Sequence, residues 1–131
     1  MSARIVDDGS GRGSYSPAVV AGGFCYVAGQ GPVDRNTREI VHGDIDIEAS
    51  QTLENLSKVL DAAGYQLSDV ISTTFYLRDM ADWKGMDIVF RRYFPTSPPV
   101  RAVVGVADLP DGTLVHLSAV AWRSSDGGSD D

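Results

Sequence analysis

Apolar positions follow a helical period in two segments of the chain. Apolar residues recur at spacings of three and four in Asp46–Ala63 and again in Asp82–Phe94, which predicts two amphipathic helices. Asp46 is the candidate N-cap of the first helix, and Gly64 is its candidate C-terminal stop. We expect the second helix to end before Pro95, because a proline interrupts the hydrogen bonding of a helix.

Other segments place β-branched and aromatic residues at alternating positions, which predicts strands. In one of them, every second residue from Ile71 to Leu77 forms a predicted buried face. Gly22 and Gly23 predict a hairpin turn, and the segment Gly29–Pro32 is expected to end the strand before it. The predicted strands are Pro17–Val20, Phe24–Ala28, Asp69–Asp79, Val100–Ala107 and Thr113–Trp122.

The order of these elements predicts an α+β fold, a mixed sheet with two helices on one face. The opposite face of the sheet then lacks a cover. Val103 and Val104 fall on opposite faces of one predicted strand, so both faces of that strand are apolar. Large apolar patches are uncommon on monomers, and the pattern therefore predicts an oligomer that buries sheet faces.

Composition and charge narrow the class of protein. The 131 residues carry a net charge of -7, and 43% of them are hydrophobic, which predicts one globular domain over residues 1–123 and a disordered acidic tail over 124–131. No apolar run approaches the length of about 18 residues that a membrane span needs, and no export signal precedes the domain, so we expect a cytoplasmic protein without a membrane partner. The acidic charge disfavours a nucleic-acid partner.

Few residues can be identified as catalytic or ligand-binding candidates from their local sequence alone. His42 and His116 are the only histidines, too few to predict a metal site, and Cys25 lies in an apolar strand where a cysteine usually packs as a small hydrophobe. Arg101 begins an apolar strand, where it either reaches solvent or holds a carboxylate or phosphate with its planar donors. On spacing alone, a structural role is favoured for His116.

Several segments together resemble the RidA/YjgF family of reactive-intermediate deaminases, also called L-PSP endoribonucleases. The resemblance implies a chorismate-mutase-like fold and a homotrimer with a cleft at each subunit interface. It covers nearly all of the chain outside the tail. The matching segments are Tyr15–Val19, Tyr26–Val33, Asn55-Leu56, Leu60–Gly64, Asp69-Val70, Thr74–Met80, Pro99–Arg101 and Gly105–Pro110.

The resemblance also implies an activity, the hydrolysis of a small carboxylated imine or enamine to a keto acid and ammonia without a cofactor. Arg101 matches the arginine that binds the substrate carboxylate, Tyr15 matches a pocket tyrosine, and Gly29 matches a pocket glycine. Four other positions match the site but differ in residue type. These are His116 for the usual glutamate, Asp87 for asparagine, Val103 for cysteine and Ala28 for serine.

The leading hypothesis is that Arg101 holds the substrate carboxylate while neutral His116 accepts a proton from water. Tyr15 would hydrogen-bond the substrate, and Asp87 would either orient His116 or repel a second carboxylate. One alternative is tautomerisation, cyclisation or lyase chemistry in a specialised biosynthetic pathway. Another is a non-catalytic trimer that binds a small carboxylate. The acidic charge makes a ribonuclease the weakest alternative.

Overall fold

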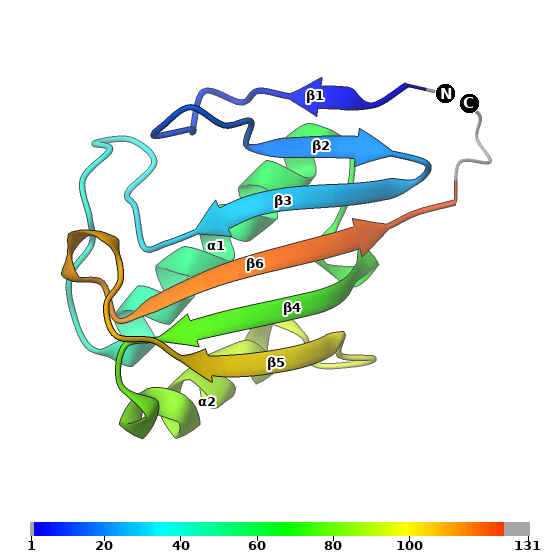
Figure 1. The fold of residues 1–131 in the computed structure, drawn as a ribbon. Helices are drawn as coiled ribbons and strands as arrows, with labels where there is room; N and C mark the ends of the chain where they lie inside the picture. The colour runs from blue at the N-terminus through cyan, green and yellow to red at the C-terminus, as the bar shows by residue number, and fades with distance from the viewer. Residues whose placement is uncertain (1, 125–131) are drawn as a thin grey trace.

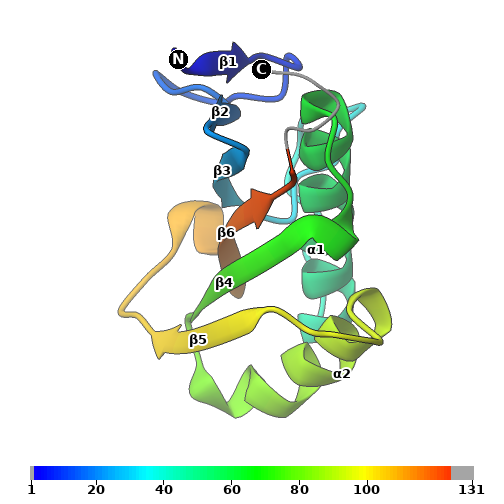
Figure 2. The same ribbon diagram turned by 90° about the vertical axis from the view of Figure 1, so that its right-hand side faces the viewer.

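A six-stranded mixed sheet with two helices on one face forms the protein, which confirms the predicted arrangement (Figures 1 and 2). The computed structural model describes residues 2–124, so the predicted tail lies outside the described residues except for Ser124. The strand order is β1-β2-β3-β6-β4-β5, and only the β4–β5 pair is parallel. The elements are β1 (Arg4–Val6), β2 (Ala18–Ala21), β3 (Phe24–Gln30), α1 (Ile45–Ala63), β4 (Val70–Leu77), α2 (Trp83–Tyr93), β5 (Val100–Gly105) and β6 (Val115–Trp122).

Helix α1 begins with a different cap from the one predicted. The carboxylate of Asp44 accepts a hydrogen bond from the Ile47 amide at 3.0 Å, so Asp44 is the N-cap and the prediction of Asp46 was wrong by two residues. Asp46 lies inside the first turn and pairs with Arg92 of α2. The predicted stop is confirmed, because Gly64 caps the helix with φ of 89°.

The buried face of β4 differs from the predicted face at its first residue. The pairing of β4 with β6 shifts register between Val70 and Ser72, and Ile71 is 43% exposed instead of buried. Thr73, Phe75 and Leu77 are buried as predicted. An extra residue in one strand of a pair reverses which face the side chains before it point to. The alternation of apolar and polar residues in the sequence does not show where such an irregularity occurs.

The N-terminal half of the sheet contains a further strand and a longer one than predicted. β1 was not predicted, because its three residues are too short to show an alternation. β3 continues through Gly29 to Gln30, which pairs with Leu117 after a register shift. The hairpin turn between β2 and β3 is confirmed, with φ of 60° at Gly22 and 85° at Gly23.

The core lies between the helices and one face of the sheet. Phe75 and Leu117 of the sheet are buried against α1 residues such as Leu56. Within residues 2–124, no α-helix covers the opposite face (Figure 2). Exposed apolar side chains on that face include Tyr26, Val104 and Trp122. Within residues 2–124, no helix has the length and apolar character that crossing a membrane would need.

Candidate functional site

A cavity of about 730 Å³ contains four of the seven predicted site residues. It is lined by the N-terminal segment, the end of β3 with the loop that follows it, and the turn before β6. Tyr15, Ala28, Gly29 and His116 all line this cavity. The structure therefore brings together residues that are up to 101 positions apart in the chain.

The imidazole of His116 lies against a loop that requires glycine. A Cβ atom added at Gly29 would stand 2.7 Å from His116 Nε2, and one added at Gly31 would stand 3.3 Å from Nδ1. Residues with side chains would therefore displace the ring. This close approach explains why glycines occur at the end of β3.

His116 has a state suited to accepting a proton. Burial lowers the pKa of His116 below its ordinary value of 6.5, because a buried cation loses solvation. The imidazole is thus neutral at pH 7. Among residues 2–124, the structure shows no hydrogen bond or ion pair to either ring nitrogen. The proton-accepting nitrogen therefore has no competing partner within the described chain.

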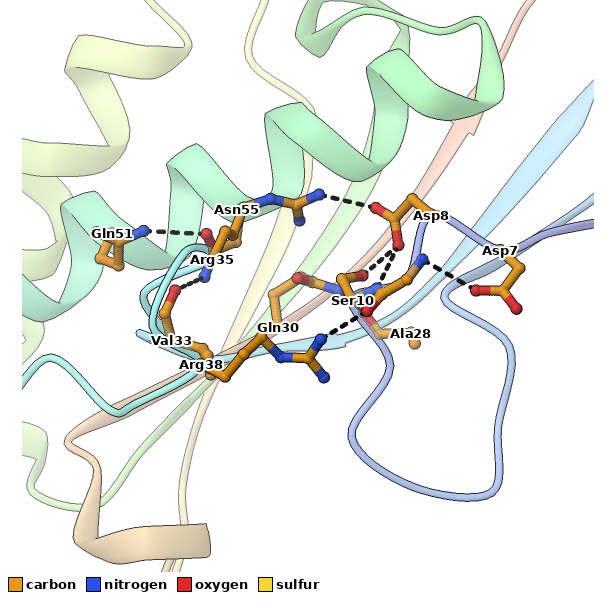
Figure 3. A network of polar contacts seen from close by, with 11 residues as sticks. Asp7, Asp8, Ser10, Ala28, Gln30, Val33, Arg35, Arg38, Gln51 and Asn55 are labelled. Atoms are coloured by element: carbon orange, nitrogen blue, oxygen red, sulfur yellow. Dashed lines mark hydrogen bonds and ion pairs between the residues drawn. The ribbon is translucent and has the colours of Figure 1, made fainter.

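Asn55 of α1 fixes the loop beside His116. Its Nδ2 donates to the carbonyl oxygens of Gly31 at 2.9 Å and Val33 at 2.8 Å, and its Oδ1 accepts from Gln51 at 3.0 Å. Figure 3 shows the contacts with Val33 and Gln51. Sequence reasoning missed this role. The available signal was a polar side chain on an otherwise apolar helix face, since Asn55 is buried between the core leucines of α1.

Arginines from the loop after β3 hold the N-terminal segment beside the cavity. Arg35 pairs with Asp8 at 3.0 Å (Figure 3), and Arg38 donates to the carbonyl oxygens of Gly9 at 2.7 Å and Gly11 at 3.0 Å. Burial alone raises the pKa of Asp8, but hydrogen bonds from Ser10 and Arg35 lower it overall. Nothing in the local sequence pairs these two segments, so sequence reasoning missed this contact.

Tyr15 is placed by the same segment. Its hydroxyl oxygen accepts a hydrogen bond from the backbone amide of Arg12 at 3.2 Å, and its side chain is exposed. The phenol therefore lies at the cavity boundary with its hydroxyl proton available to another acceptor.

Arg101, Asp87 and Val103 form a second group, outside the cavity. Arg101 Nη1 donates to Asp87 Oδ1 at 2.7 Å, and the guanidinium carbon lies 4.7 Å from the ring centre of Phe90. The hydrogen bond from Arg101 lowers the pKa of Asp87, which is ionised at neutral pH. Val103 packs against the core. The guanidinium predicted to bind a carboxylate thus already has an internal carboxylate partner.

The two groups lie on opposite faces of the sheet. Arg101 is in register with buried Thr73 on the helix-covered face, whereas His116 is in register with Tyr76. Successive residues of a strand point to opposite faces, so Thr73 and Tyr76 face opposite sides. Within one chain, Asp87 therefore contacts Arg101 and Arg91 and does not orient His116.

The described residues contain no cluster of three or more side chains arranged to hold a metal ion. Cys25 is buried, and burial raises the pKa of its thiol. A protonated, enclosed thiol is a poor nucleophile, so its environment fits the predicted structural role.

Comparison with known proteins places the chain among several similar sequences and structures. A family profile described as Endoribonuclease L-PSP matches residues 9–123. A RutC family protein of Pyrococcus horikoshii is 47% identical over 85% of this chain and 88% of its own. The human 2-iminobutanoate/2-iminopropanoate deaminase is 36% identical over 83% of this chain and 80% of its own. The crystal structure of RidA from an Antarctic Psychrobacter has a TM-score of 0.87 and 31% identity, and the match covers 92% of this chain and all of that one.

Proposed function

The chain belongs to the Endoribonuclease L-PSP family, to which RidA and YjgF proteins belong, and on this basis we propose that it hydrolyses a small carboxylated imine or enamine to a keto acid and ammonia. Imine deamination in general is supported by relatives from human and mouse that bear the name 2-iminobutanoate/2-iminopropanoate deaminase. The observation that carries the proposal is that the imidazole of His116 is neutral, has no hydrogen-bond partner within residues 2–124, and lines a cavity with Tyr15 and Gly29.

In the proposed reaction, water adds to the imine carbon while His116 accepts a proton from that water. The proton passes to the nitrogen and gives a carbinolamine. His116 then moves the hydroxyl proton of the carbinolamine to the amine, which leaves as ammonia while the oxygen forms the carbonyl of the keto acid. The balance is one imine and one water for one keto acid and one ammonia, so no oxidant or reductant is needed. Tyr15 hydrogen-bonds the substrate, and a neutral histidine near pH 7 suits this proton transfer.

We assign the substrate carboxylate to Arg101 of a neighbouring copy of the chain in a homotrimer. Arg101 lies on the edge strand β5 and on the helix-covered face, away from the cavity of its own chain. A ligand that touches both Arg101 and His116 must therefore lie between two protomers. The exposed apolar side chains of the uncovered sheet face support association through that face.

The decisive experiment supplies the purified protein with enamines generated in situ and measures keto acid and ammonia separately. We expect release of both to exceed the rate in buffer, and Arg101→Ala to abolish the increase. An isomerised or cyclised product without ammonia would support the alternative in which His116 moves a proton but water does not add. Binding of keto acids without any product would support the non-catalytic alternative.

A further inference from the structure

We propose that Arg12 and Arg38 form a second anion-binding site in the cavity, which selects ligands with a second carboxylate or a phosphate. This second site rests on the proposed function in one respect, because the proposed function supplies the imine end of the ligand that approaches His116. Its own basis is the charge, the partners and the volume of the cavity.

The cavity is locally positive in an acidic protein. Its charged lining consists of three guanidinium groups and two carboxylates, which belong to Arg12, Arg35, Arg38, Asp8 and Asp111. The whole chain carries a net charge of -7. An excess of positive charge inside a concave site concentrates anionic ligands there, even when the rest of the surface repels them.

The three arginines are not equally neutralised. Arg35 forms an ion pair with Asp8, whose side chain is only 8% exposed, so the charge of Arg35 is neutralised by a buried carboxylate. The guanidinium of Arg38 donates only to the carbonyl oxygens of Gly9 and Gly11 among residues 2–124. A carbonyl oxygen accepts a hydrogen bond but carries no net charge, and within residues 2–124 Arg38 forms no ion pair with a carboxylate.

Arg12 has a carboxylate partner that a ligand can replace. Its Nη1 lies 3.4 Å from Asp111 Oδ2, and the two side chains are 37% and 52% exposed. Exposed pairs at such distances contribute little, because water screens them. Arg38 binds the carbonyl of Gly11, which directly precedes Arg12 in the chain, and both arginines line the cavity.

The volume allows a ligand longer than a three- or four-carbon imino acid. The cavity measures about 730 Å³, within the range of roughly 300 to 1,000 Å³ typical of small-molecule sites. A ligand whose imine approaches His116 can extend a second anionic group to Arg12 and Arg38 in the same cavity. Guanidinium groups bind carboxylate and phosphate by the same forked hydrogen bonds, so both chemistries are candidates.

Titration calorimetry on the full chain tests the site with keto acids, which resemble the product and do not turn over. 2-Oxoglutarate and 2-oxopentanoate share a five-carbon chain and differ in the terminal carboxylate. We expect wild-type protein to bind 2-oxoglutarate about tenfold more tightly, and this preference to weaken at high salt. A second pair, 3-phosphoglycerate and glycerate, distinguishes a phosphate site from a carboxylate site.

Variants assign the preference to the two arginines. Arg12→Gln removes a side chain whose only described ionic partner is Asp111, and we expect it to lose most of the preference without loss of folding. Arg38→Gln should lower the preference for the ligand with two anionic groups further, although this substitution also releases the N-terminal segment. Arg92→Gln is the matched control, because Arg92 pairs with Asp46 outside the cavity and should keep the preference.

Equal binding of both members of each pair by wild-type protein would overturn the second site, and so would a preference that survives Arg12→Gln. Failure of the second site and failure of the proposed deaminase activity give different results. Ammonia release without a preference would leave the deaminase and remove the second site. A preference without ammonia release would leave the second site and remove the deaminase.

Discussion

Arg101 and Asp87 form an ion pair in which Nη1 and Oδ1 are 2.7 Å apart, and the Arg101 side chain is only 19% exposed. The guanidinium also lies over the rings of Phe90 and Trp83, which fix its plane. Asp87 thus holds the arginine in place and at the same time competes with any carboxylate that the arginine would bind. We therefore expect the residue at position 87 to influence how strongly Arg101 binds a ligand carboxylate.

Asp87→Asn should strengthen the binding of simple keto acids. Asparagine keeps an oxygen acceptor for Arg101 but removes the competing negative charge. We expect affinity for 2-oxobutanoate to rise about fivefold, which corresponds to about 1 kcal/mol, as measured by calorimetry. Asp46→Asn, which removes the partner of exposed Arg92, is the control and should leave affinity unchanged. Unchanged or weaker binding by Asp87→Asn would show that the carboxylate does not compete.

The pH dependence of the reaction should follow His116. Burial lowers its pKa below 6.5, so the imidazole is neutral at pH 7. In the proposed reaction, kcat/KM should therefore fall as the pH decreases through that lowered pKa. His116→Gln should reduce the rate by roughly a factor of 100 or more, the typical contribution of a general base. His116→Glu should restore activity and move the acidic limb toward about pH 4 to 5. A glutamine variant with the wild-type rate would exclude His116 as the base.

Gly29→Ala should impair the site without unfolding the protein. The added Cβ would stand 2.7 Å from His116 Nε2, so the imidazole must move away from the loop. We expect kcat to fall about tenfold or more, with a far-ultraviolet circular dichroism spectrum like that of wild type. The control is Gly22→Asn in the β2–β3 turn, where φ is 60° and the space is open. Equal activity of wild type and Gly29→Ala would show that the position of the ring is unimportant.

A charge on the uncovered sheet face should disrupt the proposed homotrimer. Tyr26→Asp places a carboxylate among exposed apolar side chains of β3 and β6, where a partner chain would have to bury it. We expect light scattering coupled to size-exclusion chromatography to report monomers for this variant and trimers for wild type. Ile88→Asp is the control, because Ile88 is equally exposed but lies on α2. A trimeric Tyr26→Asp variant would place the interface elsewhere.

Local periodicity predicted the two helices, the β2–β3 hairpin and most of the sheet because these features depend on neighbouring residues. It failed where a distant strand set the local geometry. Ile71 turns outward because the β4–β6 pairing shifts register beside it, and β3 extends through Gly29 because Gln30 pairs with Leu117. Both shifts arise from pairing partners that lie far away in the sequence.

The sequence by itself determined the class of fold, the family and the chemical types available, since side-chain identity fixes which groups can bind anions or accept protons. Only the tertiary structure decided which groups meet. It placed His116 between Gly29 and Gly31 in a cavity with Arg12 and Arg38, and it placed Arg101 with Asp87 on the other face of the sheet. Strand register sets these faces, and register depends on the hydrogen bonding of the whole sheet.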